Sequence, residues 1–150
     1  MGRPPMRILI VCSGNTCRSP MAGGLLGQVC SEMGREVEVE TAGLWPGGSL
    51  ATKALEAMRE VGIDISREEP KALTARLVEW ADVILCVDRR YGGEVEDRFP
   101  EASDKVAFLH RDISDPYCGS LSRYRECRDL LCEALADFVR ALPWAGCRKE

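Results

Sequence analysis

One short segment of the chain, CSGNTCRSP at residues 12–20, holds residue types that can carry out covalent chemistry. It contains Cys12, whose thiolate form is a nucleophile, and Arg18, whose planar guanidinium group can bind two oxygens of a phosphoryl group. The spacing alone carries little weight, because eight cysteines and 16 arginines among 150 residues would give roughly one such pair by chance. The significance of this pair of residues therefore depends on the sequence around it.

The residues around this pair predict a phosphate-binding loop. Residues 6–12 are a short apolar run of strand length, and Ser19-Pro20 is typical of a helix start with the serine as N-cap. Between them, Gly14 and Asn15 tolerate tight and left-handed backbone conformations, so that successive N–H groups can surround an anion. The N-terminus of the following helix also favours an anion. We therefore expect the phosphate-binding residues to be Ser13, Gly14, Asn15, Thr16, Cys17 and Arg18.

In such a loop three side chains have distinct chemical roles. The N–H donors, the helix N-terminus and Arg18 favour the thiolate form of Cys12, which can then attack phosphorus. The guanidinium group of Arg18 can stabilise the negative charge of the transition state. Ser19 can donate its hydroxyl proton to the sulfur and make it a better leaving group when the thiophosphate is hydrolysed.

Cleavage of a phosphorylated substrate also requires a proton donor. The best candidate is Asp115 in the sequence SDPY, a carboxyl group in a loop after the last strand-like segment, and Asp112 is the alternative. By itself an Asp-Pro pair indicates only a turn. Together with the cysteine loop, it favours a catalytic role for Asp115.

The elements expected around the loop alternate between strands and helices. Apolar or alternating runs predict strands at residues 6–12, 35–43, 82–87 and 105–110. Helical patterns predict helices at residues 20–33, at 50–61, from about 74 onward, and at 121–142. The Gly23-Gly24 pair is unfavourable in a helix and predicts either close packing or a local weakness there. This alternation predicts a parallel, doubly wound α/β sheet, in which ligands bind beyond the carboxyl ends of the strands, where Cys12 lies.

Length and composition exclude several classes of protein. The 150 residues predict one domain, 1–150, with a core at about 6–143. The net charge of −4 argues against nucleic-acid binding, and no apolar stretch approaches the roughly 18 residues of a membrane span. We expect a cytoplasmic monomer or weak dimer with reduced cysteines, of which Cys127 and Cys132 are buried in the last helix. No C-x-x-C pair occurs and His110 is the only histidine, so neither a metal nor another cofactor is expected.

These segments together resemble the low-molecular-weight protein phosphatase family. The similarity runs from RILIVCSGNTCRSPMA through TAG and WADVILCV to SDPY and the last helix. The resemblance implies a single domain of the phosphotyrosine phosphatase I type, with a four-stranded, parallel, twisted, Rossmann-like sheet flanked by helices. It implies that the protein dephosphorylates protein side chains through a phosphocysteine intermediate. The residues it assigns to catalysis and its support are Cys12, Arg18, Asp115, Asn15 and Ser19.

Three residues bear on the substrate. Thr16 stands where members acting on phosphotyrosine tend to carry an aliphatic residue, and where the bacterial protein-arginine phosphatase branch typically carries threonine. The sequence DPYCGSLSRY, which includes Tyr117, lacks the second aromatic residue frequent in tyrosine-specific members. Both features favour a protein-arginine phosphatase. Trp45 could instead form a wall for a phosphotyrosine ring, so a low-molecular-weight protein-tyrosine phosphatase is the alternative.

Two further alternatives are an arsenate reductase and a non-catalytic phosphate-binding module. Family resemblance implies that Cys17 can form a reversible disulfide with the nucleophile. Arsenate reductases of the same fold use such a loop and pass oxidation to two more cysteines, but here Cys86 lacks an evident partner and only Cys118 remains as a candidate. A non-catalytic phosphate-binding module would keep the loop and lose the nucleophile or the acid. The missing relay partner disfavours an arsenate reductase, and the presence of both nucleophile and acid makes the non-catalytic module the least favoured alternative.

Overall fold

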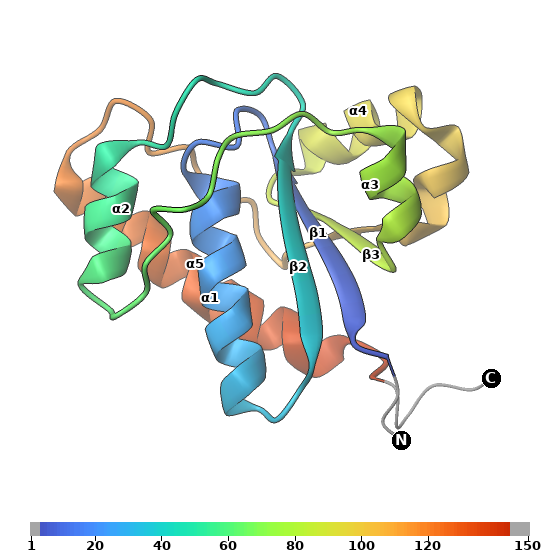
Figure 1. The fold of residues 1–150 in the computed structure, drawn as a ribbon, viewed down its shortest axis with the longest axis horizontal. Coiled ribbons are helices and arrows are strands. Elements are labelled where there is room, and N and C mark those ends of the chain that lie inside the picture. The colour runs from blue at the N-terminus through green and yellow to red at the C-terminus, as the bar shows by residue number, and fades with distance from the viewer. Residues whose placement is uncertain (1–3, 145–150) are drawn as a thin grey trace.

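A parallel sheet of four strands forms the centre of the structure, a computed structural model that describes residues 4–144 (Figure 1). The strands are β1 (Met6–Cys12), β2 (Val37–Gly43), β3 (Val83–Cys86) and β4 (Val106–Phe108), in the order β2-β1-β3-β4. All three strand pairs are parallel, and Cys12 pairs with Gly43 while Val11 pairs with Cys86. The α/β class, the parallel sheet and all four predicted strands are confirmed.

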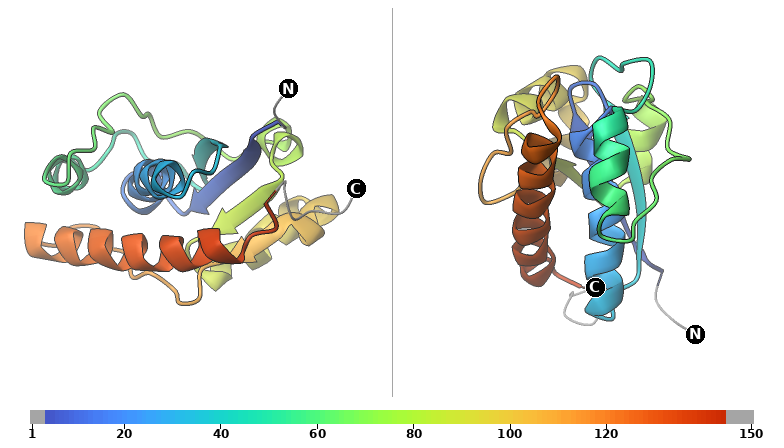
Figure 2. Two further views of the ribbon diagram at one scale, coloured as in Figure 1. Left: turned by 90° about the horizontal axis from the view of Figure 1, so that it is seen from below. Right: turned by 90° about the vertical axis from the view of Figure 1, so that its left-hand side faces the viewer.

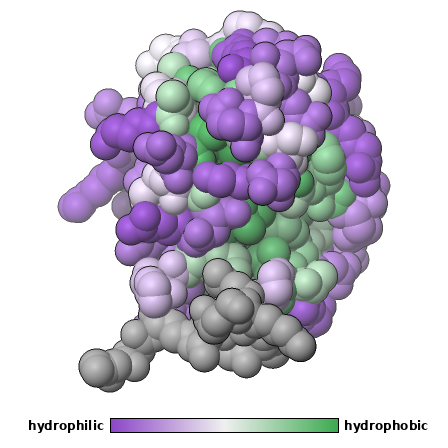
Figure 3. Space-filling view, turned by 90° about the vertical axis from the view of Figure 1, so that its right-hand side faces the viewer, coloured by the Kyte–Doolittle hydropathy of each residue, from purple (hydrophilic) through white to green (hydrophobic). Residues whose placement is uncertain are grey.

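Helices cover both faces of the sheet. They are α1 (Arg18–Glu32), α2 (Thr52–Arg59), α3 (Ala75–Trp80), α4 (Arg89–Arg98) and α5 (Leu121–Ala141), with a short 3₁₀ helix, η1 (Pro100–Lys105). Figures 1 and 2 show α1, α2 and α5 on one side of the sheet, and α3, α4 and η1 on the other. The latter side is mainly hydrophilic, with a smaller apolar area between the polar residues (Figure 3), as is usual for a globular protein.

The core is centred on β1, which lies between two strands and under both helical layers. Its residues Ile8, Leu9, Ile10 and Val11 are fully buried, which explains their continuous apolar run. Helix α1 packs closely on β2 and on the segment after α2: a Cβ on Gly23 would lie 3.0 Å from Cγ2 of Thr41, and one on Gly24 would lie 2.9 Å from Cγ2 of Ile63. The close packing predicted for the two glycines of α1 is therefore confirmed.

The structure corrects three details of the sequence analysis. Helix α1 begins at Arg18, two residues before the predicted start, and its N-cap is Cys17, so Ser19 is not the cap. Helix α4 was not predicted, although the side chain of Asp88 caps it by accepting a hydrogen bond from the N–H of Arg90. Cys132 is exposed rather than buried. Cys147 lies outside the described residues.

Candidate active site

The loop that follows β1 is held from outside through its carbonyl groups. The carbonyl oxygens of Cys12, Ser13, Gly14 and Thr16 accept hydrogen bonds from backbone N–H groups of residues 44, 45, 47 and 51, at 2.8–3.1 Å. Because these oxygens are bound on the outer side, the loop can present N–H groups on its inner side. The N–H of Asn15 lies 3.2 Å from the sulfur of Cys12, and Asn15 has the expected left-handed φ of 55°.

The end of β2 lies directly under this loop. Gly43 is the partner of Cys12 across the two strands. A Cβ atom at Gly43 would lie 2.8 Å from the carbonyl oxygen of Ser13 and 2.9 Å from the carbonyl carbon of Gly14. Only glycine allows so close an approach between the two backbones. The TAG sequence therefore supports the loop from below.

Ser19 lies beside the sulfur of Cys12. Its Oγ is 3.0 Å from Cys12 Sγ and donates a hydrogen bond of 2.6 Å to Oδ1 of Asn15, and all three residues are buried. A hydroxyl group has one proton. Ser19 can therefore donate to a thiolate only by releasing Asn15, which gives this serine a movable proton next to the nucleophilic atom.

Arg18 is almost fully buried, with 2% of its surface exposed. One terminal nitrogen donates to the carbonyl oxygen of Ile113 at 3.0 Å, and the other donates to the hydroxyl of Tyr91 at 2.7 Å. Its Nε, like Nδ2 of Asn15, is buried without a hydrogen-bond partner in the described part of the chain. Unpaired buried donors are costly, and since Arg18 lines the pocket, an oxyanion bound above Cys12 could accept from its Nε.

Tyr91 is the main functional residue that the sequence analysis missed. Its ring lies under the guanidinium group of Arg18, with the guanidinium carbon 5.3 Å from the ring centre, and its hydroxyl fixes one nitrogen of that group. Two signals could have found it. Tyr91 follows the end of β3, which is adjacent to β1, and Asp88 is a helix N-cap signal just before it.

Asp115 faces the loop from the segment before α5. Its Oδ1 accepts a 3.5 Å hydrogen bond from the thiol of Cys17 and a 3.0 Å hydrogen bond from the N–H of Tyr117, and its Oδ2 lies 3.5 Å from Arg18. The alternative acid, Asp112, accepts a hydrogen bond from the N–H of Arg89 at the start of α4 and does not line the pocket. The geometry therefore favours Asp115 over Asp112 as the proton donor.

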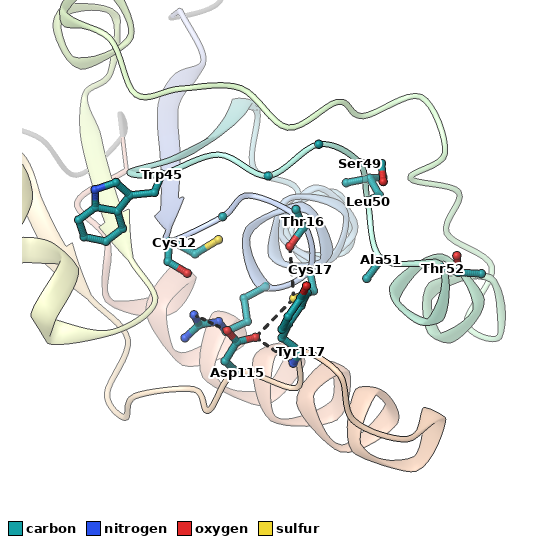
Figure 4. A pocket seen from close by; sticks show the side chains of 15 residues that line it. Cys12, Thr16, Cys17, Trp45, Ser49, Leu50, Ala51, Thr52, Asp115 and Tyr117 are labelled. Carbon is teal, nitrogen blue, oxygen red and sulfur yellow. Dashed lines mark hydrogen bonds and ion pairs between the residues drawn. The ribbon is translucent and has the colours of Figure 1, made fainter.

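These groups share one pocket of about 550 Å³ (Figure 4). Figure 4 shows Cys12, Thr16 and Asp115 around the same space, with Trp45 and Tyr117 on different sides of it. The side chains of Trp45 and Tyr117 are mostly exposed. Ser13, Gly14, Cys17 and Arg18 also line the pocket, whereas Asn15 and Ser19 lie buried beneath it. The structure thus brings every predicted site residue to one place.

The remaining cysteines differ in their access to this pocket. Burial, and then the negative charge of Asp115, raises the pKa of the Cys17 thiol to about 11, so Cys17 is a protonated thiol at neutral pH. Cys86 is fully buried, its pKa is raised to about 12 by burial, and it does not line the pocket. Cys118 is exposed. This arrangement offers no relay of thiols from Cys12 through Cys86 to Cys118.

No group of three or more His, Cys, Asp or Glu side chains that could hold a metal ion is present in residues 4–144. Within the same residues, no helix is both long and apolar enough to cross a membrane.

A parallel sheet that carries a cysteine, an anion-binding loop, a buried arginine and a facing carboxylate defines a cysteine-based phosphoryl-transfer enzyme. The family model described as low molecular weight phosphotyrosine protein phosphatase matches residues 7–145, and the chain belongs to this family. It is a cysteine-dependent protein phosphatase, and the predicted family and sheet topology are confirmed.

Three similar proteins illustrate the range of the family. The protein-arginine phosphatase of Bacillus subtilis (strain 168) is 35% identical over 146 residues, which cover 91% of this chain and 97% of that protein. A probable low molecular weight protein-tyrosine phosphatase, EpsP, of Ralstonia nicotianae is 37% identical over 142 residues, covering 90% and 97%. The solved structure of the YwlE arginine phosphatase, a cysteine-to-serine mutant with a phosphorylated active-site serine, is 33% identical with a TM-score of 0.85, covering 90% and 94%.

Replacing Tyr91 by phenylalanine is expected to weaken inhibition by vanadate about tenfold, because a hydrogen bond to a charged group contributes about 1.5–3 kcal/mol and rearrangement recovers part of it. The inhibition constant for vanadate and the melting temperature should be measured together. A lower melting temperature with unchanged vanadate inhibition would show that Tyr91 serves only in packing and does not position Arg18.

Proposed function

We propose that the protein is a protein-arginine phosphatase that works through a phosphocysteine intermediate. The observation that carries this proposal is the hydroxyl of Thr16 in the wall of the pocket, 3.9 Å from the sulfur of Cys17. A hydroxyl group there can bind polar atoms or water around a guanidinium group. A polar wall also disfavours an apolar ring, because its hydrogen-bonding groups would lose their partners.

The proposed reaction has two steps, each with defined proton transfers. In the first step, the thiolate of Cys12 attacks phosphorus, the P–N bond of phosphoarginine breaks, and protonated Asp115 gives its proton to the leaving nitrogen. The guanidinium group of Arg18 and the loop N–H groups bind the phosphoryl oxygens. In the second step, Asp115 takes a proton from water, the water oxygen attacks phosphorus, and the S–P bond breaks to release inorganic phosphate and the thiolate.

The position of Asp115 supports this role. Asp115 lines the pocket, its side chain is 43% exposed, and its Oδ2 is 3.5 Å from Arg18. Water can therefore reach the carboxylate after the first step and give it a proton in the second. Its hydrogen bond from the N–H of Tyr117 fixes the carboxyl group toward the pocket.

Replacing Thr16 by isoleucine is expected to shift the preference from phosphoarginine toward phosphotyrosine. The isoleucine removes the hydroxyl and adds an apolar surface for a phenyl ring. The ratio of kcat/KM for a phosphoarginine protein to that for a phosphotyrosine protein should therefore fall about 10- to 100-fold. Dephosphorylation of phosphoarginine-bearing and phosphotyrosine-bearing proteins should be compared for the wild type and the variant. An unchanged ratio would contradict the role proposed for Thr16.

A protein-tyrosine phosphatase is the second candidate, because two aromatic side chains line the pocket. Trp45 and Tyr117 are 58% and 66% exposed, and the guanidinium carbon of Arg98 lies 5.3 Å from the Trp45 ring centre. An aromatic substrate could stack against either ring. The planar guanidinium group of phosphoarginine could do so too, and for this reason Thr16 decides between the two proposals.

We further propose that residues 1–150 form a single phosphatase domain with its core at about 6–143, acting on phosphorylated proteins as a monomer or weak dimer in the bacterial cytoplasm. Buried side chains from β1, β3, α1 and α5 belong to one contiguous cluster, which supports a single folding unit. Sedimentation of the purified protein at several concentrations would test the monomer.

A further inference from the structure

The side chain of Thr16 lies close to Gly47, in the segment between β2 and α2. A Cβ atom on Gly47 would lie 2.7 Å from Cγ2 of Thr16, so the methyl group of Thr16 faces the α-carbon of this glycine. The N–H of Gly47 donates a 2.9 Å hydrogen bond to the carbonyl oxygen of Gly14. This bond fixes the backbone of Gly47 to the phosphate loop, so residue 47 cannot easily move away from Thr16.

The stereochemistry of threonine determines what a larger residue at position 47 would do. Threonine is branched at Cβ, and its side chain occupies one of three staggered positions. The methyl group faces Gly47. The hydroxyl faces Cys17, as Figure 4 shows. Of the two other positions, one turns the hydroxyl toward residue 47, where it would meet the same clash. The other turns the hydrogen toward residue 47 and, because the chirality of Cβ is fixed, places the methyl group where the hydroxyl was.

We propose that Gly47 is a specificity-determining residue, which keeps the hydroxyl of Thr16 in the pocket wall by leaving room for its methyl group. A side chain at position 47 would present the methyl group of Thr16 to the substrate in place of the hydroxyl. Position 47 would thus change the chemical character of the wall with no change to the sequence of the phosphate loop. This inference rests on the proposed function, because it assumes that the hydroxyl favours phosphoarginine.

The test compares Gly47→Ala with Gly48→Ala, a matched control in the same segment. A Cβ on Gly48 would meet no atom of residues 4–144 within 4 Å, and neither glycine has a left-handed φ. Both substitutions therefore add one methyl group to the same segment without backbone strain. The ratio of kcat/KM for a phosphoarginine protein to that for a phosphotyrosine protein should fall about tenfold in Gly47→Ala, and Gly48→Ala should keep the wild-type ratio.

Two further variants separate this inference from the proposed function. Thr16→Val, which has no hydroxyl, should lower the ratio at least as much as Gly47→Ala. Thr16→Ser lacks the methyl group that clashes, so adding Gly47→Ala to Thr16→Ser should leave the ratio of the single Thr16→Ser variant unchanged. This pair also remains informative if Gly47→Ala alone folds poorly.

Each outcome has a defined meaning. A lowered ratio in Gly47→Ala and Thr16→Val, with no effect of Gly47→Ala on the serine background, supports the inference. A lowered ratio in Thr16→Val alone, or equal effects of Gly47→Ala and Gly48→Ala, overturns the role of Gly47 and leaves the proposed function standing. No change of ratio in Thr16→Val overturns the proposed role of the hydroxyl itself.

Discussion

Replacing Cys12 by serine is expected to abolish hydrolysis and to leave the binding of phosphate or vanadate measurable. The serine hydroxyl is a far weaker nucleophile at neutral pH than a thiolate, and loss of a covalent nucleophile costs on the order of 10⁴- to 10⁶-fold in kcat. The anion-binding groups, the loop N–H groups and Arg18, are unchanged by this substitution. Turnover of an aryl phosphate and vanadate affinity by calorimetry should be measured on the same preparation.

The control for this experiment is Cys132→Ser, which changes an exposed cysteine of α5. This variant should keep wild-type turnover, since its thiol lies outside the pocket. Substantial turnover by Cys12→Ser would contradict the nucleophile assignment. Loss of both turnover and vanadate binding would instead indicate that the serine has disturbed the loop held by Ser19 and Asn15.

The strands of the fold could be predicted from the sequence because each has a strong local signal. Residues 8–11 are apolar at every position since β1 is buried on both faces. The end of α1 could also be predicted: the sequence predicts it at residue 33, and the helix ends at Glu32, shortly before Gly34, whose left-handed φ of 70° favours glycine.

Helix α4 could not be predicted in the same way, because its sequence contains Gly92 and Gly93, which are unfavourable inside a helix. The structure shows why glycine is required there. A Cβ on Gly92 would clash with the ring of Phe108 in β4. This tertiary contact, between residues distant in sequence, overrides the local preference and places Tyr91 under Arg18.

The candidate site could be predicted for the residues that the loop sequence contains and for Asp115. The start of α1 could not be predicted correctly. A serine followed by proline is typical of an N-cap and the first helical residue, so Ser19-Pro20 indicates a helix start two residues too late. In the structure the Ser19 hydroxyl binds Asn15 instead of a backbone N–H group of the helix. Pro20 is the third residue of the helix, and its missing N–H costs nothing because N–H groups in the first turn have no carbonyl partner within the helix. The contact of Thr16 with Gly47 likewise depends on the path of the segment after β2.

Replacing Asp115 by alanine is expected to slow the hydrolysis of phosphoarginine about 10²- to 10⁴-fold, the usual contribution of a general acid. The leaving nitrogen of phosphoarginine needs a proton when the P–N bond breaks. The leaving group of p-nitrophenyl phosphate is a stabilised phenolate and needs little assistance, so its hydrolysis should slow far less. The measurement is kcat/KM for both substrates, which differ in leaving group and use the same nucleophile.

Two related variants separate proton donation from a structural role of the carboxyl group. Asp115→Asn keeps an oxygen that can accept from the N–H of Tyr117 but cannot supply the proton, so it should show the same dependence on leaving group as Asp115→Ala. Asp112→Ala removes the hydrogen bond to the N–H of Arg89 and should slow both substrates equally, if at all. Equal losses on both substrates in the Asp115 variants would mean that this carboxylate only orients Arg18 and Cys17, because a positioning role does not depend on the basicity of the leaving group.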